Sequence, residues 1–135
     1  MTFHLADASI WGWAERSPQL AERLAERVER GELATCTPIM LEVLYSARDQ
    51  RTYDVMWERF RRLPQLDQNA QTERAALGAQ RTLSRVSEGA QRIPADDFLI
   101  AGIAQHHGAV LWHNDRHLDR ICRASGQPQE YEGVG

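Results

Sequence analysis

The stretch ADDFLIAGIAQHHGAVLWHNDRHLDRICRA, residues 95–124, decides the fold class of this chain. Residues 95–107 predict a helix that ends at Gly108, because glycine commonly terminates helices. Residues 109–112 form a short apolar run that is typical of a buried strand. Asn114 and Asp115 form a polar turn, and residues 116–124 predict a second helix. A helix, a short buried strand and another helix in this order indicate an α/β protein with parallel strands.

The rest of the chain repeats this alternation. Short strands are expected at 3–6, 33–36 and 129–131, and a weaker strand pattern covers 65–67. Helices are expected at 8–14, 18–30, 38–48, 49–63 and 70–88. Ser17-Pro18 and Thr37-Pro38 each place a capping hydroxyl before a proline, which is a typical helix start. Because strand–helix–strand units connect with a right-handed crossover, the pattern predicts an α/β/α three-layer sandwich with a short, mainly parallel central sheet.

Length and composition favour one globular domain spanning residues 1–135. No apolar run approaches the roughly 20 residues that a membrane span requires. The N-terminal residues lack the basic and apolar regions of a signal peptide. Cys36 and Cys122 are isolated, so we expect buried thiols in a reducing compartment rather than a disulfide or a metal site. These features together predict a cytoplasmic protein.

The charge balance bears on the substrate. A formal net charge of -3 argues mildly against a nucleic-acid binder. However, all 16 basic residues are arginine, the side chain best suited to bidentate phosphate contacts. Acidic residues clustered around metal ions would also reverse the local sign of the charge. Composition therefore leaves a nucleic-acid substrate open.

Four acidic residues stand where a parallel sheet would bring them together. Asp7 and Asp115 each follow a predicted strand, and Glu42 and Asp97 lie in the early turns of helices. Ligands of such sheets bind outside the carboxyl ends of the strands. Hard divalent cations prefer carboxylate oxygens, and a pair of such ions can promote phosphodiester hydrolysis. The sequence therefore predicts a divalent-metal site formed by these four acids.

Each acid taken alone also has a simpler interpretation. Asp97 could interact with a helix dipole, Glu42 could lie on a solvated helix face, and Asp115 could cap the last helix. The adjacent Asp96 could be a solvated neighbour. The local motifs around the acids decide between these interpretations.

Four motifs occur in a fixed order along the chain. They are LADAS at 5–9, PIMLE at 38–42 followed by YSAR at 45–48, IPADDFLIA at 93–101, and HHGAVLWHNDRHLDRI at 106–121. In this order they resemble the PIN-domain nucleases and, within them, the VapC-like toxins of type II toxin–antitoxin systems. The resemblance spans nearly the whole chain, from Asp7 to Ile121, and it implies a PIN-like fold.

The resemblance also implies a function and a site. It implies an endoribonuclease that hydrolyses RNA phosphodiester bonds with a metal-activated water. Asp7, Glu42, Asp97 and Asp115 would be the catalytic metal ligands for Mg²⁺, or for Mn²⁺ in its place. Asp97 matches better than Asp96 because it directly precedes the apolar run of the helix. Ser9 would orient a carboxylate or a metal-bound water, although it could equally be an ordinary hydroxyl at a helix start.

One position departs from the family pattern. Many relatives carry a further aspartate two residues after the equivalent of Asp115, where this chain has His117. His117 could ligate a softer ion, shuttle a proton, contact phosphate or be an exposed substitution. The departure puts a second metal ion in doubt. A zinc site is disfavoured, because only His113 and His117 flank an acid and the neighbouring His106 and His107 would diverge on a helix.

Relatives of this kind form homodimers and bind a VapB-like antitoxin, so the resemblance implies these partners besides an RNA substrate (tRNA, rRNA or mRNA). The aromatic residues favour core or dimer contacts over base stacking, and they are Trp11, Trp13, Tyr45, Tyr53, Trp57 and Phe60. Two other functions stay open. One is a PIN-domain RNA-processing nuclease without a toxin role, and the other is a catalytically degenerate domain that only binds a protein partner.

Overall fold

The computed structural model describes residues 1–134, and its centre is a parallel sheet. The strands run in the order β2-β1-β3-β4, and all neighbouring pairs are parallel. Their bounds are β1 His4–Ala6, β2 Leu33–Ala34, β3 Val110–His113 and β4 Gln129–Tyr131. The predicted strand at 65–67 is wrong, because Gln65 forms only an isolated bridge with Thr35.

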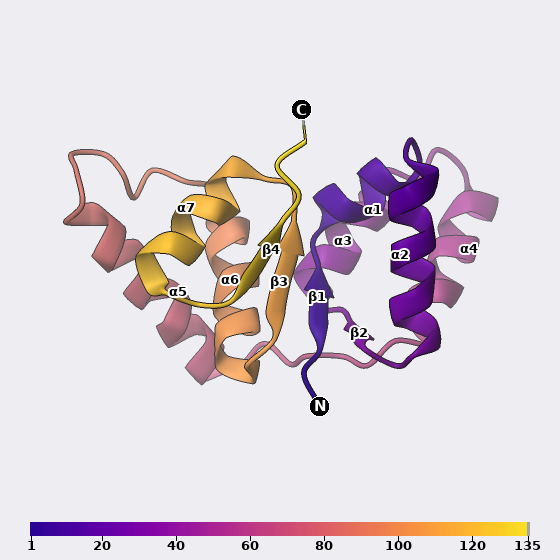
Figure 1. Ribbon diagram of the computed structural model, residues 1–135, viewed down its shortest axis with the longest axis horizontal. Coiled ribbons are helices and arrows are strands. Elements are labelled where there is room, and N and C mark those ends of the chain that lie inside the picture. Colours follow the sequence, from indigo (N-terminus) through magenta and orange to yellow (C-terminus); the bar gives the residue numbers. More distant parts are fainter. Residues whose placement is uncertain (135) are drawn as a thin grey trace.

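Helices cover both faces of this sheet, as Figure 1 shows. α5, α6 and α7 lie on one side, and α1 to α4 lie on the other. Their bounds are α1 Ala8–Ala14, α2 Pro18–Glu29, α3 Thr37–Tyr45, α4 Gln50–Phe60, α5 Ala70–Ser84, α6 Ala95–His107 and α7 Arg116–Ser125. This arrangement confirms the predicted three-layer α/β/α fold.

The alternation of side chains along the strands divides the core into two clusters. Leu5 and Leu111 are aligned across β1 and β3 and pack with α5, α6 and α7. Ala6 and Trp112, one residue further along, pack with residues of α1, α2 and α4. Successive residues of a strand point to opposite faces, so two to four residues per strand are enough to bury both layers.

Local capping explains where the helices begin. The Ser17 hydroxyl accepts from the Leu20 N–H and precedes Pro18, as predicted. Asn69 and Thr72 form a reciprocal capping box at the start of α5. At α3 the prediction is off by one residue, because Cys36 occupies the N-cap position without a side-chain cap.

The predicted run of helix from residue 38 to 63 is wrong at its middle. α3 ends at Tyr45, and Asp49 adopts an extended backbone with φ -146° and ψ 169°. Its carboxylate accepts from the Thr52 N–H and so begins a new helix. α5 likewise ends at Ser84, short of the predicted residue 88.

α5 and α6 pack at unusually close range through Gly102. A Cβ atom added to Gly102 would lie 2.9 Å from the Ala76 nitrogen and 3.1 Å from the Ala76 Cβ, and still nearer the Thr72 carbonyl oxygen. A residue with any side chain would therefore force the two helices apart. Glycine at this position allows α6 to pack directly on the backbone of α5.

Other sequence expectations can be checked on the described residues. No helix among residues 1–134 is long and apolar enough to cross a membrane. Cys36 and Cys122 are buried and free, as predicted. The aromatic residues divide into two groups: Trp11 and Phe60 pack edge to face in the core, whereas Tyr45, Tyr53 and Trp57 are exposed.

Candidate metal centre

Asp7 lies at the carboxyl end of β1 and caps α1. Only 3% of its surface is exposed. Its Oδ2 accepts from the Ser9 backbone N–H at 3.1 Å and from the Ser9 hydroxyl at 2.7 Å. Burial raises the pKa of Asp7, and the negative charge of Asp115 adds to this rise against the hydrogen bonds from Ser9. Asp7 is thus a carboxylate held in one orientation and short of positive charge.

Asp115 occupies the equivalent place after β3. Its Oδ1 accepts from the His117 N–H at 2.7 Å, so it does cap α7. Capping and metal binding are compatible here, because the cap uses Oδ1 and the other carboxylate oxygen can face a cation. The interpretation of Asp115 as a helix cap is therefore correct, and a role as a metal ligand stays a prediction.

Asp97 points into the structure from the first turn of α6, and it is 8% exposed. Burial, together with the smaller effects of the charges of Asp115, Asp96 and Asp7, raises the pKa of Asp97 to about 7. Asp96 is exposed on the same turn. Between these two adjacent acids, it is Asp97 that lies among the other carboxylates.

Glu42 approaches from α3 on another side. Although its residue surface is largely exposed, desolvation of its carboxyl group raises the pKa of Glu42 to about 7. A hydrogen bond with Asp96 and the charges of Asp7, Asp96 and Asp97 contribute to the rise. Asp96 is therefore more than a solvated neighbour, because its hydrogen bond and its charge both help to raise the pKa of Glu42.

His117 joins the cluster from the first turn of α7. Its Nδ1 lies 3.5 Å from Asp97 Oδ2 and 4.0 Å from Asp115 Oδ1. One ligand atom from each of Asp97, Asp115 and His117 falls within 4.8 Å of the others. Asp7 and Glu42 border this trio without belonging to it.

The donor set fits a small divalent cation. Among residues 1–134, the structure records no arginine ion pair to Asp7, Glu42, Asp97 or Asp115. No arginine therefore offsets the mutual repulsion of these acids, and this repulsion adds to the effect of burial in raising the pKa of Asp7, Glu42 and Asp97. Carboxylate oxygens with one imidazole suit Mg²⁺ or Mn²⁺.

Ser9 connects the two strand ends. Its hydroxyl donates to Asp7 and accepts from the Asn114 backbone N–H at 2.9 Å. The turn that carries Asp115 is thereby fastened to the turn that carries Asp7. Ser9 orients Asp7 through this contact, which favours the positioning role over an ordinary hydroxyl at a helix start.

Sequence reasoning missed a role for His113, which it considered only as a zinc ligand beside His117. His113 is fully buried, and both ring nitrogens are engaged in hydrogen bonds within the protein. Neither nitrogen is free to ligate an ion. The pair of His113 and His117 therefore forms no zinc site.

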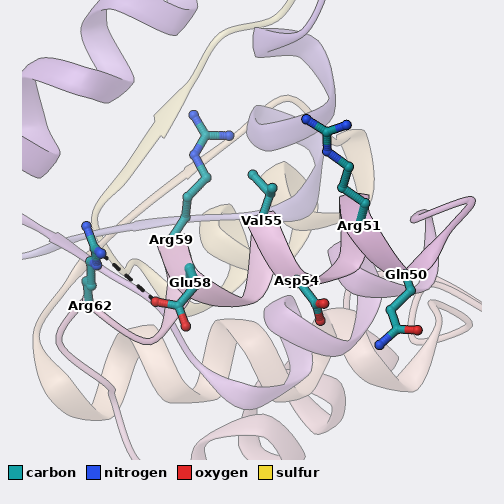
Figure 2. Close-up of a pocket in the computed structure, with 7 residues that line it drawn as sticks. All are labelled: Gln50, Arg51, Asp54, Val55, Glu58, Arg59 and Arg62. Carbon is teal, nitrogen blue, oxygen red and sulfur yellow. Dashed lines mark ion pairs between the residues drawn. The ribbon is translucent and has the colours of Figure 1, made fainter.

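A second hollow lies apart from the carboxylates, along the exposed face of α4. Figure 2 shows its lining, in which Glu58 and Arg62 form an ion pair at 4.0 Å. The lining residues are Gln50, Arg51, Asp54, Val55, Glu58, Arg59 and Arg62. None of them belongs to the carboxylate cluster, and no buried acid or base stands among them. The chemistry of this chain is therefore concentrated at the sheet edge.

Comparison with known families decides how this geometry is classified. The PIN domain family model matches residues 5–124, which include all four acids. The chain belongs to the PIN-domain family. PIN nucleases are metal-dependent, and the trio of Asp97, Asp115 and His117 is the part of this PIN domain able to hold a metal ion.

Individual relatives refine this membership. Ribonuclease VapC18 of Mycobacterium tuberculosis is 32% identical over 93% of this chain and 91% of its own length. Ribonuclease VapC51 of the same organism is 31% identical over 95% of this chain and 91% of its own length. This PIN domain is thus of the VapC type over nearly its full length.

Solved structures share the fold. The PIN domain resembles a chain of DNA-bound VapBC from Salmonella typhimurium with a TM-score of 0.77 and 22% identity, covering 97% of this chain and 98% of that one. VapBC-1 from nontypeable Haemophilus influenzae gives a TM-score of 0.75 at 16% identity, covering 98% of this chain and 100% of that one. At these identities the likeness establishes the fold.

Proposed function

We propose that this PIN domain is a Mg²⁺-dependent endoribonuclease that acts as the toxin of a VapBC-type toxin–antitoxin system. The observation that carries the proposal is the convergence of Asp7, Asp97 and Asp115 at the carboxyl edge of the sheet. The chain is 32% identical to a ribonuclease over nearly its full length, and this acidic cluster suits metal-dependent hydrolysis of RNA. The reaction is hydrolysis of an RNA phosphodiester bond by water.

Each acid has a role in this proposal. Asp97 and Asp115, which lie in one cluster with His117, would hold the ion together with Asp7, which Ser9 keeps in orientation. Glu42, which approaches the other acids from α3, would complete the ligand set. A bound divalent ion would supply Lewis acidity towards the phosphodiester. Mg²⁺ suits the carboxylates, and Mn²⁺ also tolerates the imidazole of His117.

The proposed partners are an RNA, a VapB-like antitoxin and a second copy of this chain. Relatives named as ribonucleases support the RNA, and solved neighbours described as VapBC complexes support the antitoxin. A basic antitoxin segment would complement the unpaired acids. Leu41 and Tyr45 on α3 are 65% and 91% exposed, and such apolar side chains are consistent with a protein contact.

Free buried cysteines are consistent with a cytoplasmic location.

The loss of an acid at position 117 does not favour a degenerate, binding-only domain. His117 places a nitrogen donor 3.5 Å from Asp97 and so keeps a metal-ligating atom in the cluster. A nuclease for RNA processing without a toxin role uses the same site. The two are separated by whether expression of the chain alone stops growth and whether a cognate antitoxin restores it.

RNA-end mapping in cells tests the proposal directly. The wild-type chain and its Asp97→Asn variant are expressed from an inducible promoter, and new RNA 5′ ends are mapped across the transcriptome. We expect discrete new ends and arrested growth with wild type only. The same purified chains are tested on total RNA with Mg²⁺, with Mn²⁺ and with a chelator. Equal cleavage by both chains, or cleavage that survives chelation, would overturn the proposed function.

A further inference from the structure

His113, the last residue of β3, is buried with both ring nitrogens paired. Its Nδ1 accepts from the Asp115 backbone N–H at 3.1 Å. Its Nε2 lies 2.8 Å from Gln129 Oε1 on the edge strand β4. The imidazole also stacks on Tyr131, with ring centroids 4.9 Å apart and an interplanar angle of 16°. The ring is therefore fixed between the acid-bearing turn and β4.

The protonation of this ring follows from its neighbours. Gln129 Nε2 donates to Asp119 Oδ1 at 2.9 Å, and a carboxylate can only accept. Gln129 must therefore turn its carbonyl oxygen towards His113. The His113 Nε2 consequently carries the proton, and Nδ1 is left as a bare acceptor for the Asp115 N–H. Arg123 pairs with the same carboxylate, its Nε lying 3.1 Å from Asp119 Oδ2, so Asp119 accepts from both Gln129 and Arg123.

We propose that His113 is a positioning residue for the metal centre, acting through Asp115 and held in its tautomer by Gln129. The inference rests on the proposed function, since it concerns how one of the proposed metal ligands is presented. As N-cap of α7, Asp115 has a backbone N–H with no partner inside the helix. His113 supplies that partner and thereby fixes the backbone from which the Asp115 carboxylate projects.

The neighbouring residue of the turn is fixed as well, from two other directions. The Asn114 N–H donates to Ser9, and the Asn114 side chain exchanges hydrogen bonds with the backbone of Val134 at 2.8 and 3.0 Å. A purely structural histidine would need only to fill space between Leu111 and Tyr131. The acceptor aimed at the Asp115 N–H is the feature that a space-filling role leaves unexplained.

Two substitutions at position 113 separate these roles. His113→Asn keeps an acceptor oxygen close to the place of Nδ1, whereas His113→Leu fills the space without an acceptor. We expect His113→Leu to bind Mn²⁺ about 10–100-fold more weakly than wild type, as is typical when a group that orients a ligand is lost. His113→Asn should recover most of that affinity. Affinities are measured by calorimetry, on variants whose circular dichroism and cooperative melting match those of the wild type.

Imidazole nitrogen chemical shifts test the relay without any metal ion. A long-range ¹H–¹⁵N spectrum of the metal-free wild type should show His113 as the Nε2–H tautomer. Gln129→Met, which keeps the length of the side chain but removes both of its hydrogen bonds, should allow the two tautomers to mix. A fixed Nδ1–H tautomer in wild type, or an unchanged spectrum in Gln129→Met, would overturn the relay.

The two measurements distinguish the relay from the proposed function. If wild type binds metal and a folded His113→Leu binds it equally well, His113 does not position Asp115 and the inference is wrong. If wild type binds neither Mn²⁺ nor Mg²⁺, the proposed function fails. In that case the tautomer still decides whether His113 holds the turn.

Discussion

The Nδ1 of His117 lies 3.5 Å from Oδ2 of Asp97 and 4.0 Å from Oδ1 of Asp115, so an imidazole borders two carboxylates. An imidazole is a softer ligand than a carboxylate and carries no negative charge when it ligates a metal. The metal centre of this chain should therefore discriminate less strongly in favour of Mg²⁺ than an all-carboxylate site.

Substitution of His117 tests this ligand difference. We expect His117→Asp to increase the affinity for Mg²⁺ relative to Mn²⁺ and to keep or improve Mg²⁺-dependent cleavage. His117→Ala should lower cleavage modestly and leave Mg²⁺ binding detectable, because the carboxylates remain. Calorimetric titration with each ion provides the comparison. An inactive His117→Asp chain with unchanged metal affinity would count against a ligand role.

The adjacent acids of α6 provide a matched pair of variants. Asp97→Asn should reduce RNA cleavage by about 10²-fold or more, because it removes a buried charge from the metal cluster. Asp96→Asn should be milder, since Asp96 is exposed and acts through its hydrogen bond with Glu42. Both rates are measured on one RNA substrate under single-turnover conditions. The reverse order of effects would show that Asp96 is the ligand.

Stability of the metal-free chain should depend on pH with a definite sign. Burial and neighbouring charges raise the pKa of Asp97 and of Glu42 to about 7, from ordinary values of 3.8 and 4.5. Because the folded chain favours the protonated forms, their contribution is full below the unfolded values and is lost as pH rises through about 7.

The Tm in the presence of a chelator should therefore fall between about pH 5 and about pH 8, and Asp97→Asn should flatten part of that fall. Differential scanning calorimetry across this range checks the slope. A metal-free Tm that rises steadily through the same range would contradict the crowding of these acids.

Metal binding should offset the loss of stability that the ionised acids cause in the metal-free chain. With Mn²⁺ at about 100 times its Kd, the folded state should gain roughly 2.7 kcal/mol and the Tm should rise accordingly. Asp7→Asn should raise the metal-free Tm, because burial disfavours the Asp7 charge, and should shrink the shift caused by Mn²⁺. Sodium at equal ionic strength is the control. Identical Mn²⁺ shifts in both chains would mean that Asp7 takes no part in binding.

Helix packing provides a prediction independent of the metal. Gly102→Ala should destabilise the fold by about 1–3 kcal/mol, since the new methyl group meets the backbone of α5. Gly78→Ala in α5 is the control, because nothing lies within 4 Å of the added Cβ. That change should stabilise the chain by about 0.4–1 kcal/mol. Urea unfolding measures both, and equal effects would disprove the close contact.

The sequence was sufficient to predict the layers of the fold and where the acids lie along it. Asp7 and Asp115 could be recognised because each directly follows a buried strand, and the carboxyl ends of parallel strands share one edge. The break after Tyr45 was missed because the apolar residues on both sides continue a helical pattern. There, the Asp49 cap outweighs the propensity of the surrounding residues.

The contacts that surround the four acids could not have been predicted in the same way. The contact of His113 with Gln129 joins residues 16 positions apart and depends on how β3 and β4 are aligned. A histidine at the end of an apolar strand has no signature that separates a hydrogen-bonded ring from a ligand. The involvement of Asp96 was missed for a similar reason, because it arises from the approach of α3 to α6.

The position of β4 has a consequence for the order in which the enzyme is made. Arg23 and Arg27 of α2 bind Glu130 and Glu132, at distances of 2.9 to 3.0 Å, and Gln129 holds His113. All these acceptors leave the ribosome after Asp115. At about 5–20 residues per second, Gln129 follows Asp115 after roughly one to three seconds. During that interval all four acids have been synthesised, but β4, whose Gln129 contacts His113 beside Asp115, has not.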